Sequence, residues 1–190
     1  YGMCVADVLP LIVVFAYNRP MHLERCLASL DACVGSEGYR VRVYCDGPRS
    51  EQDEHMCDRV RTVARTLRRF RAIDVVERAT NLGLSGSVIK GVGECLGERE
   101  QVIVVEDDLV VSPQFIEFMS RGLELYQDDE RVASVHGYVY PVEDDLPDSF
   151  FLRGADCWGW GTWRRAWERF CPVGQILLEG LKAERLERVF

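Results

Sequence analysis

Five short, mostly apolar runs recur along the chain, and polar turn residues follow most of them. The runs lie at residues 11–15, 41–45, 73–76, 102–105 and 132–135. Continuous apolar runs of this length are typical of strands that are buried on both faces of a parallel sheet. The run at 102–105 contains only Val and Ile, which predicts a central strand.

Helical periodicity fills the intervals between these runs. The spacing predicts one helix that begins at Pro20 and others over residues 51–70, 85–96 and 112–126. Strands that alternate with helices predict an α/β fold, a three-layer sandwich around a mainly parallel sheet. We therefore expect a single domain over residues 1–190, with a C-terminus that has the character of a truncation. After about Pro141 the sequence becomes more aromatic and irregular.

Polar side chains cluster where the predicted strands end. Asn18 and Arg19 follow the first strand, Asp46 follows the second, and three acids follow the fourth at residues 106–108. In open α/β sheets, ligands bind outside the carboxyl ends of the strands. The sequence therefore predicts that three polar clusters meet at one edge of the sheet and form a binding site there.

Glu106, Asp107 and Asp108 are the clearest candidate metal ligands. Adjacent carboxylates at a strand end repel one another unless a cation neutralises them. Hard oxygen ligands suit Mn²⁺ or Mg²⁺, and these ions also bind substrate phosphates. On an extended segment alternate residues point the same way, so we expect Glu106 and Asp108 to face one ligand and Asp107 to face elsewhere. A solvated acidic turn ahead of the next helix is the alternative.

The sequence VIVVEDDL at residues 102–109 resembles the strand and "DxD" segment of glycosyltransferases with the GT-A fold. Further segments resemble family 2 of these enzymes in the same order. They are VVFAYNRP at 13–20, YCDGP at 44–48, NLG at 81–83, and FFLR with WGWGTW between 150 and 163. The resemblance covers roughly residues 10–170. It implies a nucleotide-binding half over about 10–110 and an acceptor-side half over about 111–190.

The resemblance also implies roles for the acids. Asp108 would ligate the metal directly. Glu106 would lie near the metal and near the ribose and diphosphate of the donor. Asp107 would act through the metal's water shell or contact the sugar. Asp46 would accept a hydrogen bond from the nucleotide base, which favours uracil.

Uncharged and basic residues complete the implied donor site. Tyr17, Asn18 and Arg19 would line the nucleotide pocket, with Tyr17 stacked on the base and Arg19 near phosphate. Asn81 and Gly83 form the turn before the next helix. Packing and solvated-loop roles are the alternatives for Tyr17 and Arg19.

Family 2 members are usually inverting, and inversion requires a carboxylate base near the attacking hydroxyl. Asp156, just before Cys157, is the first candidate. Glu168 is the second, and Asp144 or Asp145 the third. An exposed loop carboxylate is the alternative interpretation of Asp156.

Four tryptophans are concentrated between residues 158 and 167. Trp158 and Trp160 lie in a Gly-interrupted loop and are candidates for acceptor binding, since aromatic faces stack on sugar rings. Trp163 and Trp167 are four apart on a predicted helix, which favours core packing. The resemblance to GT-A enzymes, some of which complete the metal site with a histidine, makes His136 the candidate for that role; a hydrogen-bonded or exposed histidine without a metal is the alternative interpretation.

The net charge of −8 argues against general nucleic-acid binding, which needs clustered positive charge. An exception is a group of arginines between residues 59 and 71, which we interpret as a solvated helix face. An anionic acceptor or membrane surface is the alternative for this group. No apolar run approaches 18 residues, so no transmembrane segment is expected. The eight cysteines form no C-x-x-C pair.

These cysteines fit apolar positions, which favours a reducing, cytoplasmic compartment, at the inner face of the membrane if the acceptor is lipid-linked. A lumenal location stays open if an N-terminal anchor precedes the chain. The predicted function is transfer of a hexose or N-acetylhexosamine from a UDP-sugar to a glycan or lipid-linked acceptor, dependent on Mn²⁺ or Mg²⁺.

Three other functions are consistent with part of the sequence. A nucleotidyltransferase of sugar 1-phosphates would need a glycine-rich loop at residues 16–20, where there is no glycine. A receiver domain would need a phospho-accepting aspartate after a later apolar strand. A non-catalytic domain that binds nucleotide sugars would keep the first half and lose the base.

Overall fold

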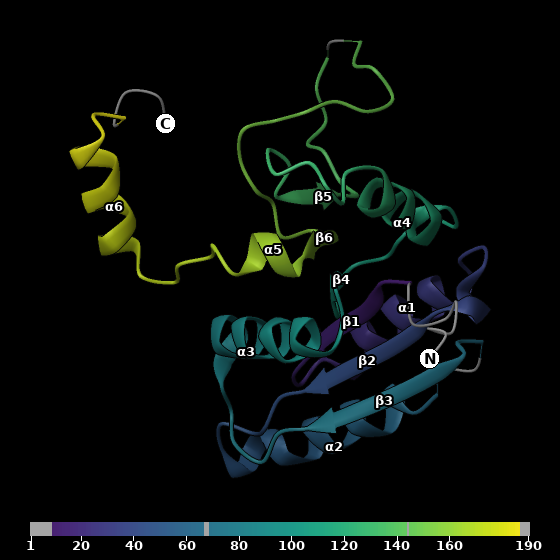
Figure 1. The fold of residues 1–190 in the computed structure, drawn as a ribbon. Helices are drawn as coiled ribbons and strands as arrows, with labels where there is room; N and C mark the ends of the chain where they lie inside the picture. The colour runs from purple at the N-terminus through teal and green to yellow at the C-terminus, as the bar shows by residue number, and fades with distance from the viewer. Residues whose placement is uncertain (1–8, 67–68, 144, 187–190) are drawn as a thin grey trace, which may run out of the picture.

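The computed structural model describes residues 9–66, 69–143 and 145–186 and is organised around one six-stranded sheet (Figure 1). The strand order is β3-β2-β1-β4-β6-β5. The strands are β1 Leu11–Ala16, β2 Arg40–Cys45, β3 Ala72–Glu77, β4 Gln101–Glu106, β5 Ser134–His136 and β6 Trp160–Trp163. Strands β1 to β4 pair in parallel, whereas β6 pairs antiparallel with both β4 and β5. The predicted mainly parallel sheet is thereby confirmed.

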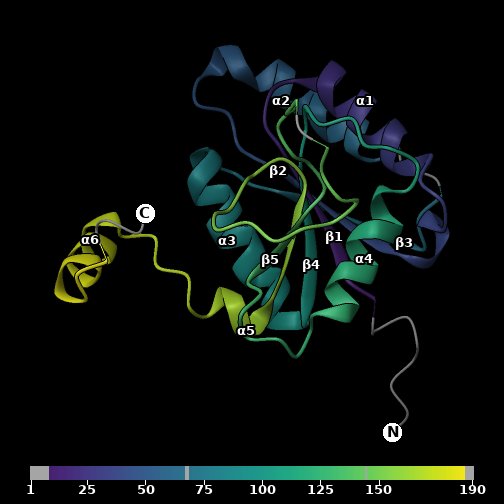
Figure 2. The same cartoon turned by 90° about the horizontal axis from the view of Figure 1, so that it is seen from above.

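Helices cover both faces of the sheet, as Figure 2 shows from above. They are α1 Pro20–Asp31, α2 Glu51–Ala64, α3 Gly83–Glu98, α4 Phe115–Leu125, α5 Arg164–Trp167 and α6 Gly174–Ala183, with a 3-10 turn η2 at Ser36–Gly38. The cores show which helix covers which face. Residues of α1, α2 and α4 share one buried cluster with Ile12 and Val14, whereas α3 shares the other with Val13 and Phe15. The chain is therefore an α/β sandwich of three layers.

Strand β1 explains why the apolar runs identified this architecture. All six of its residues are buried, and alternate side chains enter the two opposite cores. Its neighbours on both sides continue the parallel ladder past the strand ends, because the Asp46 N–H donates to Ala16 O and the Asp107 N–H donates to Phe15 O. These two bonds hold Asp46 and Asp107 on either side of the segment that follows β1.

Several predicted boundaries differ from the structure. Helix α2 ends at Ala64 instead of about residue 70, and residues 67–68 lie outside the described ranges. Helix α4 begins at Phe115, after Gln114 as its N-cap, although Ser112 and Pro113 resembled a helix start. Helix termini are the least specified part of a periodic pattern, because the side chains there leave the buried face.

Strand β6 was the main element that the sequence did not predict. The spacing of its sequence WGTW predicts a loop in the first part and a helix in the second. The glycine is needed because a Cβ on Gly161 would lie 3.0 Å from Val102 O and 3.1 Å from Leu123 Cδ1. A glycine that lets two strands approach closely looks, in sequence, like a loop residue.

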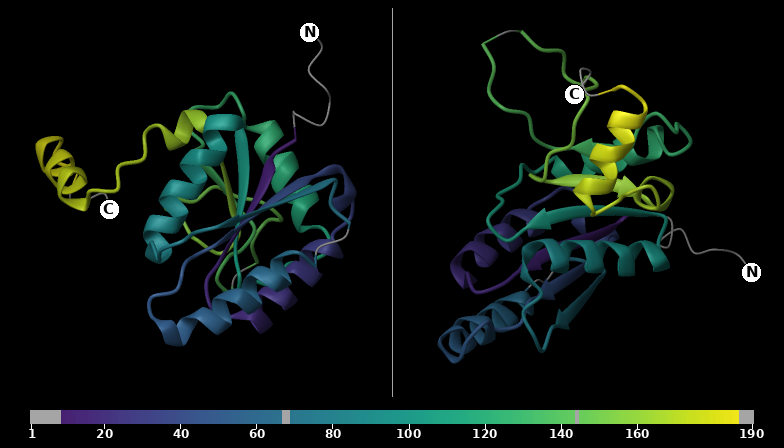
Figure 3. Two further views of the ribbon diagram at one scale, coloured as in Figure 1. Left: turned by 90° about the horizontal axis from the view of Figure 1, so that it is seen from below. Right: turned by 90° about the vertical axis from the view of Figure 1, so that its left-hand side faces the viewer.

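Helix α6 has no buried residue and stands clear of the rest of the described chain in Figure 1, in Figure 2 and in the left view of Figure 3. Sequence periodicity did not lead us to expect it. No helix among the described residues is long and apolar enough to cross a membrane.

Two compositional features have structural counterparts. In the arginine group, Arg61 and Arg65 both pair with Glu77 of β3, so part of this helix face is neutralised within the chain. Arg68 of the same group lies outside the described residues. The cysteines of the described ranges are free thiols, and Cys4 lies outside those ranges.

Candidate functional site

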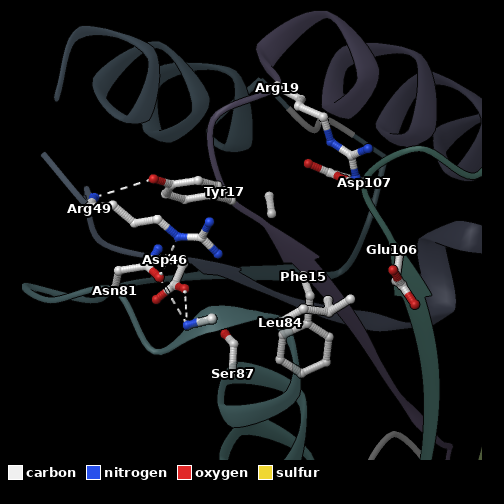
Figure 4. Close-up of a pocket in the computed structure, with 12 residues that line it drawn as sticks. Phe15, Tyr17, Arg19, Asp46, Arg49, Asn81, Leu84, Ser87, Glu106 and Asp107 are labelled. Carbon is white, nitrogen blue, oxygen red and sulfur yellow. Dashed lines mark hydrogen bonds and ion pairs between the residues drawn. The ribbon is translucent and has the colours of Figure 1, made fainter. Parts of the chain in front are cut away.

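A pocket opens at the carboxyl ends of β1, β2 and β4 (Figure 4). Its wall combines residues from four separate segments: the loop after β1, the loop after β2, the start of α3 and the end of β4. The predicted site residues among them are Tyr17, Arg19, Asp46, Asn81, Gly83, Glu106 and Asp107. The predicted meeting of polar clusters at this edge is therefore what the structure shows.

Asp46 is buried, with 4% of its surface exposed, and its carboxylate organises the start of α3. Oδ1 accepts the N–H groups of Gly47 and Leu82 at 3.0 Å each, and Oδ2 accepts those of Leu82 and Gly83 at 3.1 Å each. The first N–H groups of a helix have no partner within the helix, and a negative charge is favourable there. Asp46 thus ties the end of β2 to the N-terminus of α3.

The Asn81–Gly83 turn is held by the same loop. Asn81 Nδ2 donates to Gly47 O at 2.8 Å, and Asn81 Oδ1 accepts the Gly83 N–H at 3.1 Å. Gly83 has a φ of 71°, a left-handed conformation that favours glycine. In the NLG motif, the asparagine thus holds the turn by hydrogen bonds and the glycine allows its left-handed backbone conformation.

Asp53, in the first turn of α2, is a pocket-organising residue that sequence reasoning missed. Tyr17 Oη donates to Asp53 Oδ2 at 2.8 Å, and Asn18 Nδ2 donates to Asp53 Oδ1 at 3.0 Å. These two hydrogen bonds lower the pKa of Asp53. The pattern Ser50-x-x-Asp53 at a helix start predicts a capping role instead, but neither side chain caps α2 and Asp53 accepts hydrogen bonds from the loop after β1.

Arg49 was also missed, because it lies in no motif. Its Nε donates to Asn81 Oδ1 at 3.1 Å, its guanidinium lies 5.3 Å from the centre of the Tyr17 ring, and its backbone N–H donates to Tyr17 Oη at 3.2 Å. Arg49 therefore closes one side of the pocket over Tyr17, as Figure 4 shows.

The opposite side of the pocket carries the carboxylates. Strand β4 ends at Glu106, and Asp107 and Asp108 form a turn. Arg19 bridges them: its Nη2 contacts Asp107 Oδ1, and its Nη1 lies 3.1 Å from Asp108 Oδ2. The expectation that Asp107 faces away was therefore wrong, because strand alternation stops where the turn begins. Asn18 and Asp108 do not line the pocket but contact Asp53 and Arg19 at its rim.

Burial makes this carboxylate cluster electrostatically unfavourable. Burial, and then the negative charges of Asp108 and Asp107, raise the pKa of Glu106. Burial raises the pKa of Asp107 as well, although Arg19 opposes it. Asp107 is 3% exposed, and its Oδ2 has no hydrogen-bond partner within the described ranges. An unpaired buried carboxylate oxygen of this kind is suited to a cation.

The oxygen donors fit a magnesium-like ion. Within the described residues, no three His, Cys, Asp or Glu side chains form a ready-made metal cluster. Such ions, however, usually take one or two protein carboxylates and complete their shell with water and substrate phosphates. The unpartnered Oδ2 of Asp107 and the carboxylates beside it meet that requirement.

The candidate bases of residues 144–156 do not line the pocket where the structure describes them. Asp156 Oδ1 accepts the N–H of Trp158 at 3.0 Å. Burial raises the pKa of the neighbouring Cys157, and the charges of Glu106 and Asp156 raise it further, so this loop is within electrostatic range of the carboxylate cluster. Asp145 is exposed, and Asp144 lies outside the described residues.

Glu168 was a wrong choice for a base. Strand β6 runs antiparallel to β4 and pairs Trp163 with Gln101, at the amino end of β4. Residues after Trp163 therefore continue away from the carboxyl end where Glu106 lies. His136 is half-buried with its Nε2 2.7 Å from Ser134 Oγ, and it does not line the pocket.

The tryptophans divide into two groups. Trp163 is buried and donates from Nε1 to Leu123 O at 3.0 Å, which confirms its core role, although it lies on β6. Trp160 stacks with Trp167 against the α3-side core. Trp158 is 43% exposed and contacts the rings of Tyr138 and Tyr140, with centroids 4.9 Å and 5.6 Å apart. The two tyrosines were not identified from the sequence.

Comparison with known proteins agrees with this arrangement. Residues 11–164 match the family model described as glycosyl transferase family 2. No curated protein sequence matches the chain. A solved structure of S. aureus TarS 1–349 in complex with UDP matches with a TM-score of 0.50 and 18% identity, covering 83% of this chain and 47% of that one.

Two further solved structures are similar. A mannosyltransferase from Pyrobaculum calidifontis, PcManGT, in complex with GDP-Man and Mn²⁺, has a TM-score of 0.49 and 15% identity, over 67% of this chain and 35% of that one. The galactosyltransferase LgtC, with donor and acceptor sugar analogs, has a TM-score of 0.46 and 18% identity, over 90% and 64%. The chain thus spans from about a third to under two thirds of these proteins, and the fold is that of GT-A glycosyltransferases.

Proposed function

The chain belongs to glycosyl transferase family 2, and on that premise we propose that it transfers a sugar from a nucleotide-sugar donor to an acceptor hydroxyl with the help of a divalent cation. One observation carries this proposal. The pocket at the carboxyl ends of β1, β2 and β4 has an aromatic and polar side at Tyr17 and Asp46, and a carboxylate side at Glu106 and Asp107. Those two sides suit the two ends of a nucleoside diphosphate.

The nucleoside would lie against Tyr17, Asp46 and Arg49. Asp46 already receives four N–H···O contacts from three backbone N–H groups, because the Leu82 N–H is shared between its two oxygens. An imino N–H of a base would therefore take the place of one of the two shared Leu82 contacts. Uracil carries such a group, and the TarS structure with the same fold holds UDP. We therefore propose a UDP-sugar as donor, with a hexose or N-acetylhexosamine as the transferred sugar.

The diphosphate would lie at the carboxylate side. Asp108 and Glu106 would hold Mn²⁺ or Mg²⁺, which when bound stabilises the negative charge of the leaving diphosphate. Asp107 would contribute its unpartnered Oδ2 or act through bound water. Arg19 is the cationic side chain that lines this part of the pocket.

Asp156 would take the proton of the acceptor hydroxyl as its oxygen bonds to the anomeric carbon, and the bond from that carbon to the diphosphate would break on the opposite face, which gives inversion and releases the nucleoside diphosphate. The charge of Glu106 acts on Cys157, the neighbour of Asp156, and the hydrogen bond from the Trp158 N–H orients the Asp156 carboxylate. The exposed rings of Trp158, Tyr138 and Tyr140 would stack on an acceptor sugar, so a glycan or a lipid-linked sugar is the proposed acceptor. Trp160, the other tryptophan predicted to bind acceptor, stacks with Trp167 against the α3-side core, so we do not include it in this aromatic cluster.

Asp108→Ala tests the donor site. UDP binding by titration calorimetry should gain affinity from Mn²⁺ in the unchanged protein, and this gain should disappear in the variant. The exposed Asp145→Ala is a matched control that should keep it. An undiminished response to Mn²⁺ in Asp108→Ala would overturn the assignment.

Product analysis tests the reaction class. A transferase releases UDP from a UDP-sugar, whereas a nucleotidyltransferase would release pyrophosphate from UTP and a sugar 1-phosphate. Asp156→Asn should bind UDP normally and lose transfer. Transfer that persists in this variant would eliminate Asp156 as the base.

A further inference from the structure

Arg19 is already bound where the proposed cation would act (Figure 4). We propose that Arg19 is an internal counter-cation for Asp107 and Asp108, that a divalent ion displaces it, and that the released guanidinium then binds the diphosphate of the donor. This inference rests on the proposed function, because it requires both a divalent ion and a diphosphate in the pocket.

The geometry resembles that of a bridging ion. Two different nitrogens of Arg19 contact two different carboxylates, Nη2 with Asp107 and Nη1 with Asp108. The residues are 88 and 89 positions apart in sequence, so the contact joins the loop after β1 to the turn after β4. Each oxygen that Arg19 occupies is unavailable to a metal ion at the same time.

The two sides of this contact differ in their freedom to move. The Arg19 side chain is 44% exposed, whereas the Asp107 side chain is 4% exposed. Backbone bonds fix both residues, since Arg19 O accepts the N–H groups of His22 and Leu23 and the Asp107 N–H donates to Phe15 O. The guanidinium can therefore turn into solvent without exposing the core, but the Asp107 carboxylate cannot follow it.

The negative charge of the three carboxylates favours release of Arg19 only when a divalent ion takes its place. Departure of the guanidinium alone would take the ion pair away from a buried carboxylate whose Oδ2 has no hydrogen-bond partner among the described residues, and would leave it only a backbone hydrogen bond from Tyr17. The three carboxylates carry more negative charge than one guanidinium neutralises, so the cluster still attracts a cation. A divalent ion would compensate the loss of Arg19.

The released guanidinium has a destination in the same pocket. Arg19 lines the pocket together with Glu106 and Asp107. A planar guanidinium binds phosphate oxygens through two parallel N–H groups, which an ammonium cannot do. Arg19 would thus neutralise the carboxylates before the metal binds and the diphosphate afterwards.

The experiment measures Mn²⁺ binding to the whole chain without nucleotide, by titration calorimetry and by the loss of the free Mn²⁺ signal in electron paramagnetic resonance. Arg19→Met removes the charge and the bridge. Arg19→Lys keeps the charge but cannot bridge both carboxylates. Both variants should bind Mn²⁺ about fivefold more tightly, the equivalent of one partly exposed ion pair.

The second part of the experiment measures UDP binding, which should be weaker in the variant than in the unchanged protein. With Mn²⁺ saturating, UDP should bind about fivefold more weakly to Arg19→Met, because the diphosphate loses its guanidinium partner. Arg131→Met is the matched control, since Arg131 forms an exposed pair with Asp129 on the acceptor side, and it should change neither affinity. Thermal unfolding in a chelator verifies that Arg19→Lys is folded.

The outcomes separate the two proposals. Unchanged Mn²⁺ affinity in both Arg19 variants would overturn the exchange. A gain in Arg19→Met with none in Arg19→Lys would also overturn it, because long-range charge alone would then account for the effect. If the unchanged protein binds neither Mn²⁺ nor UDP, the proposed function itself fails.

Discussion

The two halves of the chain use their polar and aromatic residues in opposite ways. In the donor half, over about residues 9–110, the Asp46 carboxylate accepts three backbone N–H groups, and the Asp53 carboxylate accepts hydrogen bonds from Tyr17 and Asn18. In the acceptor half, over about residues 111–186, Trp158 and Tyr140 contact each other and remain largely exposed. Hydrogen bonds between elements hold the polar side chains of the donor pocket, whereas the aromatic side chains Trp158 and Tyr140 present ring faces to solvent.

This difference fits the chemistry proposed for each half. A nucleoside diphosphate has the same shape in every reaction cycle, so a pocket built between strand ends can be fixed before it binds. Acceptors differ among enzymes of one fold, and loops carried on a rigid scaffold are where such differences accumulate. Four experiments follow, from the largest expected effect to the smallest.

Asp46→Ala should have the largest effect on stability. The substitution leaves buried N–H groups of the β2–α3 junction without an acceptor, so the free energy of unfolding should fall by about 3 kcal/mol. Urea unfolding measures this fall. Asp148→Ala, an exposed carboxylate of the acceptor half, should change it by less than about 0.5 kcal/mol. Equal effects would remove the contrast between the halves. UDP affinity should also fall in Asp46→Ala, with the response to Mn²⁺ retained.

The donor half was also the half that the sequence predicted well. Fully buried parallel strands leave continuous apolar runs, and each run ends at the same edge of the sheet, so Asp46 and Glu106 could be placed together without coordinates. The partners of these residues could not be placed in that way. Asp53 and Arg49 reach the pocket from a helix start and a loop, and their contacts depend on how α2 packs on the sheet.

The acceptor half left weaker signals. Strand β6 has four residues and pairs antiparallel, so neither an apolar run nor a regular alternation marks it. Glu168 was misplaced for that reason, because the direction of β6 decides which edge its flanking residues reach. Tyr138 and Tyr140 belong to an irregular segment, where spacing carries no information about which rings meet.

Gly47→Ala and Gly137→Ala compare the two halves with one chemical change. A Cβ on Gly47 would lie 2.5 Å from the backbone carbon of Thr80, whereas one on Gly137 would lie 2.5 Å from Cε2 of the Phe115 side chain. Backbone yields less readily than a ring, so we expect losses of about 2 kcal/mol for Gly47→Ala and about 1 kcal/mol for Gly137→Ala. Thermal unfolding of both variants checks the order. A larger loss at Gly137 would mean that the acceptor half is the more rigidly packed one.

Trp158→Ala should separate acceptor binding from donor binding. The ring is 43% exposed, so its removal should lower the free energy of unfolding by less than about 1 kcal/mol. UDP affinity should not change, because Trp158 does not line the donor pocket. With an acceptor identified by transfer assay, KM for that acceptor should rise several-fold while KM for the donor stays constant. A rise in both would show that the aromatic cluster and the donor pocket act as one site.

Asp53→Ala gives the smallest effect and appears as a change in pH dependence. Hydrogen bonds from Tyr17 and Asn18 lower the pKa of Asp53 in the folded chain. A lowered folded-state pKa means that the stabilisation is present above the unfolded value of about 4 and is lost as pH falls through the folded one. Between about pH 5 and pH 3, the free energy of unfolding of Asp53→Ala should therefore vary less with pH than that of the unchanged protein, which urea unfolding at several pH values measures. Glu54→Ala, one residue further along α2 and exposed, is the control that should retain the full pH dependence. If the free energy of unfolding of Asp53→Ala falls on acidification as steeply as that of Glu54→Ala, then the hydrogen bonds from Tyr17 and Asn18 to Asp53 do not stabilise the donor half, and its rigidity would depend on the other contacts of the pocket, those of Asp46 first.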